Sequence, residues 1–183
     1  YVKTAGDNAV MTAEQMKAVA DAVKALATPA TVDFSEVVYE SETFPNSFKA
    51  NANLAGIVFP HNVAKTASAA FQKTGMTSVT LLKGISYGSN AFDSCASLVS
   101  VTVEEGVTEI GNYMFQNTKL TDVTLPNSVT KIGASAFNGC SLTTINFGQG
   151  VKTIENSAFQ NCGELTEIIL PDATETLGQN AFG

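Results

Sequence analysis

The 183-residue chain has no arginine and no tryptophan, and it has a single histidine. Its ten lysines are outnumbered by seventeen acidic residues, which gives a net charge of -7. Nucleic-acid binding needs dense positive charge, and arginine supplies the planar fork that grips phosphate, so no nucleic-acid partner is expected. One histidine also argues against histidine acid–base catalysis and against multi-histidine metal sites.

Long hydrophobic runs are missing as well, because none approaches the ~18 residues of a membrane-spanning helix. The composition, 44% hydrophobic and 15% charged, is apolar enough to bury a core and too apolar for disorder. The length predicts one domain, or one with an appendage. The chain opens at Tyr1 without a basic segment followed by an apolar one, so we expect either a cytosolic protein or a signal peptide that has been removed.

A repeat organises most of the chain. Phenylalanines recur every 21 to 23 residues, and five of the six follow an alanine. They are Phe71, Phe92, Phe115, Phe137, Phe159 and Phe182. The cleanest unit, residues 120–140, reads Leu-x-x-Val-x-Leu-Pro-x-x-Val-x-x-Ile-Gly-x-x-Ala-Phe-x-x-Cys. The unit that begins at Met76 lacks one residue, and we expect Tyr87 to take its Ile slot.

Each unit has the pattern of one coil of a solenoid. In the run from Leu120 to Leu125, Val123 and Leu125 have the period-two spacing of a short, half-buried strand. The Pro-Asn pair that follows predicts a turn. Ile132 is expected to point inward, and Gly133 is expected to permit a turn at positive φ. One coil cannot bury its own apolar face, so the coils should stack, and six strands ~4.8 Å apart predict a sheet roughly 29 Å wide.

The repeat motif resembles the BspA-like leucine-rich repeats of bacterial surface antigens, over residues 54–183 with a weaker echo before them. The resemblance implies a β-rich, right-handed solenoid of about 22-residue repeats with a parallel sheet on one face. It also implies a secreted or surface-attached protein that adheres to host matrix proteins or to other microbes. The family carries no catalytic residues, so none is transferred to this chain.

The first 53 residues do not follow the repeat closely. Thr12 and Gln15 form a capping-box pattern, and apolar residues at helical spacing predict a helix over 12–27. A cap over the first coil is favoured over a membrane-surface helix, because the lysines on its polar side are balanced by acids. The predicted division is an N-terminal helical cap over 1–30, a degenerate first repeat over 31–53 with Phe48 and Asn51 in the Phe and Cys columns, and six repeats over 54–183.

The last of these repeats is truncated at Gly183, so we expect a fragment of a longer protein.

The three cysteines occupy one column of the repeat. Cys95, Cys140 and Cys162 each follow the repeat phenylalanine by three positions, and Thr74 and Thr118 fill that column in other units. A slot that accepts Cys or Thr indicates a small buried side chain, so free buried thiols are predicted. Neighbouring coils could bring two thiols within disulfide reach, but side chains stacked in parallel seldom have the required dihedral angle.

Other candidate sites have simpler interpretations. His61 is expected to be a solvated turn residue, and Gly148-Gln149-Gly150 a repeat turn rather than a phosphate loop. The acidic run around Glu104 lacks the oxygen-rich spacing of a calcium loop, so a solvated turn is expected. We therefore predict no catalytic residue, no cofactor and no metal.

A surface remains as the candidate functional feature. The strand position between the Val and the second Leu should point outward in every unit. That column consists of Val58, Thr80, Thr102, Thr124, Asn146 and Ile169. It can reflect sheet propensity alone, since threonine suits exposed strand positions, or it can be a flat binding face of the kind that solenoids present.

We therefore expect a non-enzymatic, extracellular or cell-surface module of a bacterial surface protein that acts in protein interaction or adhesion. The expected partner is a protein or glycan, such as a host matrix protein, and the expected state is a monomer that does not insert into membranes. Two alternatives stay open: a structural spacer in a longer surface protein, and part of a secreted enzyme whose active domain lies outside this chain.

Overall fold

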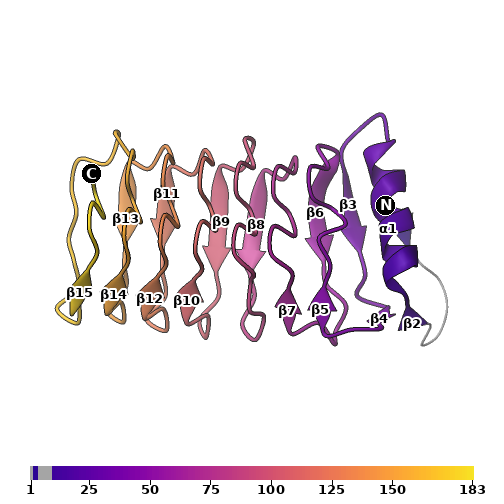
Figure 1. Ribbon diagram of the computed structural model, residues 1–183, viewed down its shortest axis with the longest axis horizontal. Helices are drawn as coiled ribbons and strands as arrows, with labels where there is room; N and C mark the ends of the chain where they lie inside the picture. The colour runs from indigo at the N-terminus through magenta and orange to yellow at the C-terminus, as the bar shows by residue number, and fades with distance from the viewer. Residues whose placement is uncertain (1, 4–9) are drawn as a thin grey trace.

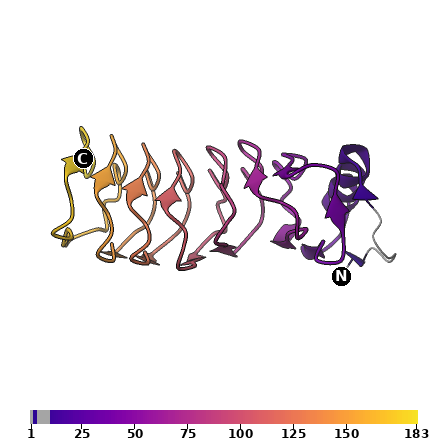
Figure 2. The same ribbon diagram turned by 90° about the horizontal axis from the view of Figure 1, so that it is seen from below.

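The computed structural model describes residues 2–3 and 10–183 as an elongated solenoid of about seven turns. The coils lie side by side along one axis, with a helix at the N-terminal end and the last coil at the other end (Figure 1). Seen from the side, each coil is a separate loop stacked on the next (Figure 2). The predicted fold class, a parallel-strand leucine-rich-repeat solenoid with one N-terminal helix, is confirmed.

Short strands line two sides of the solenoid, and all their pairings are parallel. The first strand row consists of β1 (Val2–Lys3), β3 (Ala30–Asp33), β6 (Leu54–Val58), β8 (Ser78–Leu81), β9 (Ser100–Val103), β11 (Asp122–Thr124) and β13 (Thr144–Asn146). The second strand row consists of β5 (Thr43–Phe44), β7 (Lys65–Thr66), β10 (Glu109–Ile110), β12 (Lys131–Ile132), β14 (Thr153–Ile154) and β15 (Thr176–Leu177). The pair β2 (Val10–Met11) and β4 (Val38–Tyr39) joins the helical end to the first coil.

The first strand row is not the single sheet that the repeat predicts. Its hydrogen-bonded groups are β1-β3-β6, β8-β9 and β11-β13, and residues 163–170 of the last coil form no strand. The prediction of one continuous sheet across six coils is therefore wrong. The second row is bonded from β10 through β15, and separately from β5 to β7.

The coil of residues 76–97, here called the short coil, explains one break in each row. Its connection from Thr80 to Tyr87 is one residue shorter than the equivalent connection in the next coil. The strand of the short coil pairs with the following coil through β8 and β9, whereas its Ser86 bridges back to Lys65 of the preceding coil. The short coil is thus tilted, which opens the first row on one side of it and the second row on the other.

The backbone around the repeat phenylalanines forms a third and continuous row, here called the spine. The Phe115 N–H donates to the Ala136 carbonyl at 2.8 Å, and equivalent bonds join the coils from Phe71 to Ala181. Residues two before and two after the phenylalanine have positive φ, and this conformation turns their N–H groups toward the next coil. Ser135 (φ 53), for example, donates to the Asn156 carbonyl at 3.0 Å.

This arrangement corrects the expectation for the glycine column. Gly133 does not have a positive φ, which falls instead on Ser135. Glycine is needed at position 133 because a Cβ there would lie 2.8 Å from the backbone nitrogen of Asn112 and 2.9 Å from the carbonyl carbon of Gly111. Glycine at position 133 is therefore required by the close approach of two coils, whereas Ala67 and Glu155 occupy the same column in other coils.

The core is a ladder of phenylalanine rings inside the spine. Phe137 is fully buried, with its ring centroid 5.5 Å from Phe115 and 5.2 Å from Phe159, and near-parallel to both. The stack continues in both directions to Phe71 and to Phe182. The buried Tyr87 takes the Ile position of the repeat in the short coil, as predicted.

Helix α1 (Ala13–Lys24) lies against the first coil at the N-terminal end (Figure 1). The predicted capping box is confirmed, with Thr12 Oγ1 accepting from the Gln15 N–H, although the helix is shorter than the predicted span of 12–27. Its buried face includes Met16 and Val23. The buried Asn51 takes the Cys position of the first coil and donates to a carbonyl of the helix, at Ala20, at 2.9 Å. Residues 1 and 4–9 of the predicted cap lie outside the described residues.

Candidate interaction surface

The predicted outward column of the first strand row is exposed in every coil. Its members are Val58, Thr80, Thr102, Thr124, Asn146 and Ile169. Thr80 lies beside Thr102 in register, and Thr124 lies beside Asn146. The breaks in the sheet separate these pairs, so the surface consists of short, two-coil segments rather than one regular array.

The surface lacks positive charge. Neither of the two outward columns of the first strand row, at the Thr124 and the Asp122 positions, contains a lysine in any coil from residue 54 to 183. Asp122 accepts hydrogen bonds from Thr144 and Thr121, and these bonds hold the pKa of its carboxyl below its usual value. Lys65 and Lys131 lie instead in the second strand row, where Lys131 Nζ is 2.9 Å from a carboxylate oxygen of Glu155.

The break between β6 and β8 contains a pocket of about 420 Å³, here called the slot. Backbone and side chains of β6 line one side and those of β8 line the other, and Phe92 lies at its base with Met76. None of the residues that line the slot is charged. Sequence reasoning did not identify it, although the missing residue of the short coil was the available signal.

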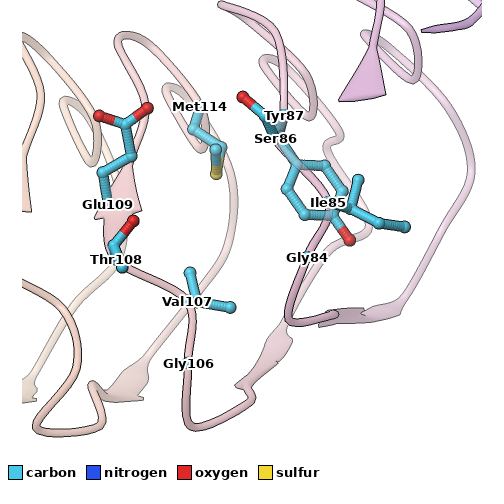
Figure 3. Close-up of a pocket in the computed structure, with 9 residues that line it drawn as sticks. All are labelled: Gly84, Ile85, Ser86, Tyr87, Gly106, Val107, Thr108, Glu109 and Met114. Carbon is cyan, nitrogen blue, oxygen red and sulfur yellow. The ribbon is translucent and has the colours of Figure 1, made fainter. Parts of the chain in front are cut away.

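A second pocket, of about 230 Å³, opens where the short coil leans away from the following coil in the second strand row. Figure 3 shows Met114 between Glu109 on one coil and Tyr87 on the other. The Tyr87 hydroxyl accepts the Leu82 N–H at 3.1 Å, and burial raises the pKa of Tyr87 to about 12, so the phenol is neutral. Its lining offers one carboxylate and no cation.

Apolar side chains are exposed at the end of the solenoid opposite the helix. The exposed fraction is 74% for Ile169 and 53% for Leu177, and Ile168 and Leu170 are also exposed. Ile168, Leu170 and Leu177 occupy columns that point inward in the other coils, and there a following coil covers them.

The cysteines form a buried hydrogen-bonding column, not a reactive site. All three are free and buried, as predicted. Cys140 Sγ donates to the Phe115 carbonyl of the preceding coil at 3.1 Å and lies 3.2 Å from the Thr118 hydroxyl. Burial raises the pKa of Cys140 to about 11, and it also raises the pKa values of Cys95 and Cys162. All three thiols therefore stay protonated at neutral pH.

The remaining sequence candidates lie in turns. His61 is exposed in the turn after β6, and Gly148-Gln149-Gly150 forms the turn after β13. Among the described residues, no group of three or more His, Cys, Asp or Glu side chains is placed to hold a metal ion. No helix in the described part of the chain is long and apolar enough to cross a membrane.

Comparisons with known proteins agree with the repeat architecture. A model of the BspA type leucine rich repeat region matches residues 31–95 and 85–183, with six copies. A leucine-rich repeat protein from Eubacterium ventriosum superposes with a TM-score of 0.64 at 22% identity, over 79% of this chain and 43% of that one. A leucine rich cell surface protein from Faecalibacterium prausnitzii gives a TM-score of 0.49 at 22% identity, over 80% of this chain and 49% of that one.

The chain therefore spans less than half the length of either of these two solved structures. A search of curated proteins finds no match. The family model covers most of the chain, and its repeat pattern is the one that the coils and the phenylalanine ladder follow. The chain belongs to the BspA-type leucine-rich repeat family of bacterial proteins.

Proposed function

We propose that this protein is a non-enzymatic interaction module of a bacterial surface protein, and that it binds a protein or glycan partner through its first strand row. The observation that carries the proposal is the exposed, lysine-free column around Thr102 and Thr124, which recurs coil after coil on one side of the solenoid. Such side chains lose little conformational entropy when a partner covers them.

Other features support this assignment. The continuous spine and the buried phenylalanine ladder give the strand row a rigid support. Tyr87 and Cys140, whose pKa values are raised by burial, lie in the core and are held neutral there. Binding that does not depend on lysines should survive moderate salt, because ionic screening weakens only interactions between charges.

The proposed location is extracellular or at the cell surface, and the proposed state is a monomer. We also retain the division into a cap over residues 1–30, a degenerate repeat over 31–53 and six repeats over 54–183. A host matrix protein is the proposed partner class, with a cell-wall glycan as the second candidate.

Binding of the isolated chain to a panel of immobilised matrix proteins and cell-wall glycans tests the proposal. We expect saturable binding to at least one member of the panel, with an affinity that changes little between low and moderate salt. A chain that binds no member would contradict the proposal and favour the spacer interpretation. Binding that disappears at moderate salt would show that charges, not the first strand row, make the contact.

A further inference from the structure

The slot between β6 and β8 exposes the edge of a parallel sheet on its β6 side. The carbonyl of Val58 accepts the Phe34 N–H at 3.0 Å, so the backbone groups of Val58 face β3. Alternate residues of a strand direct their N–H and C=O groups to opposite sides. The backbone groups of Ile57 therefore face the slot, where β6 has no bonded strand partner.

A second edge faces it from the β8 side. The carbonyls of Thr77 and Leu81 accept N–H groups from the coil of β9, each at 3.0 Å. The same alternation directs the backbone groups of Ser78 and Thr80 into the slot, because their neighbours face β9. Two parallel strands that run in the same direction thus present unpaired backbone groups to one another across a pocket of about 420 Å³.

The chemistry of the slot favours one kind of occupant. Unpaired strand edges are templates for another extended chain, and only an extended backbone offers donors and acceptors to both edges at once. The base of the slot is apolar, with Phe59, Met76 and Phe92, and no lining side chain is charged. A segment with small, uncharged side chains matches this lining, since a charged side chain would be desolvated there without a partner.

We propose that the slot accepts an extended, uncharged peptide segment of a partner protein, which adds as a strand between β6 and β8. This inference rests on the proposed function and specifies its partner as a protein with such a segment. The inserted strand joins the sheet β1-β3-β6 to the sheet β8-β9, so that peptide binding continues the first strand row across the short coil. The one-residue deletion before Tyr87 is then the feature that creates the site.

The test uses the blocked hexapeptide with the sequence of residues 98–103, which is uncharged and includes the whole of strand β9, Ser100–Val103. Amide hydrogen exchange of the whole chain is followed by NMR with and without this peptide. We expect exchange at Ile57, Ser78 and Thr80 to slow by at least ~tenfold. The same peptide N-methylated at every residue keeps its side chains and loses its donors, so it should give no protection.

A protein variant tests the same edge. Thr80→Pro removes an N–H that faces the slot, and proline is tolerated at strand edges, so the variant should melt near the unchanged chain and lose peptide protection. No protection with peptide at up to about 1 mM, or equal protection by the N-methylated peptide, overturns the slot proposal. Panel binding is measured separately, so the two proposals can fail independently. Panel binding without slot protection overturns the slot proposal and leaves the proposed function standing. Slot protection without panel binding supports the slot proposal and contradicts the partner classes named in the proposed function.

Discussion

At the scale of single residues, the cysteine column shows how one position serves the fold without serving chemistry. Thr74 and Thr118 donate to the carbonyl of the phenylalanine of their own coil at 2.9 Å, whereas Cys95 and Cys140 donate to the phenylalanine carbonyl of the preceding coil. Either side chain satisfies a buried carbonyl, and this explains why both types occur there. The prediction of free buried thiols rested on that alternation and was confirmed.

A pH prediction follows for Cys140, whose pKa is raised by burial from its ordinary 9.0 to about 11. A raised pKa in the folded state means that its stabilising effect is complete below pH 9 and is lost as pH rises toward 11. We expect about 2–3 kcal/mol of unfolding free energy to disappear over that window. Cys140→Thr should be nearly as stable at pH 7 and should lose less stability between pH 9 and 11, as measured by urea denaturation.

If the variant and the unchanged chain lose equal stability over that window, Cys140 is not the titrating group. Tyr87, with a pKa raised to about 12, is present in both chains and therefore cancels in the comparison.

A glycine substitution tests the close approach of the coils. A Cβ at Gly133 would meet backbone atoms of the preceding coil at 2.8 and 2.9 Å, so Gly133→Ala should cost ~1–3 kcal/mol of unfolding free energy. Gly163 has no atom within 4 Å of the equivalent position, and Gly163→Ala should change stability by less than about 0.5 kcal/mol. Chemical denaturation of both variants measures the difference, and equal losses would contradict the proposed packing.

At the scale of elements, the features that depend on local side-chain pattern were predictable from the sequence. The spacing of the phenylalanines, the capping box at Thr12 and the place of Tyr87 all follow from side-chain type and periodicity, and the structure has them. The positive φ values were assigned to the wrong column. They fall two residues before the phenylalanine, where Asn90 and Ser135 stand and no glycine occurs, and two residues after it, where Gly139 is the one glycine among the described residues. Asparagine, which tolerates this conformation, was the available signal.

The breaks in the first strand row could not be predicted in the same way. A missing residue before Tyr87 was visible, but its effect depends on which neighbour each part of the short coil bonds to. Ser86 bonds to the preceding coil and β8 to the following one, and only the three-dimensional arrangement reveals this. The outward direction of the column at Thr102 was predictable, whereas its division into segments, and with it the slot, was not.

The phenylalanine ladder gives a prediction at this scale. Phe137 stacks between two rings and is fully buried, so Phe137→Ala should cost ~3–5 kcal/mol. Phe182 stacks only on Phe159 and is partly exposed, so Phe182→Ala should cost less than about 2 kcal/mol. Denaturation of both variants in urea gives the two values. Equal losses would mean that the ladder is not one continuous core.

At the scale of the whole molecule, the solenoid separates its roles among its sides. The spine carries the continuous hydrogen bonds, the second strand row carries ion pairs such as Lys131–Glu155, and the first strand row carries small, mostly uncharged side chains. This separation lets one side change in sequence while the others maintain the stack. It also means that matched substitutions on different sides have different expected effects on binding.

The most direct test of binding through the first strand row compares two such double variants. Both are assayed for binding to the matrix protein or glycan of the panel that binds the unchanged chain. Thr102→Lys with Thr124→Lys places charge on the first strand row, and Thr108→Lys with Thr130→Lys places the same charge on exposed threonines outside it. Both should fold with nearly unchanged melting temperatures, since all four side chains are exposed. We predict at least ~tenfold weaker binding for the first variant and unchanged binding for the second. Loss of binding in the second variant alone would contradict the assignment of function to the first strand row.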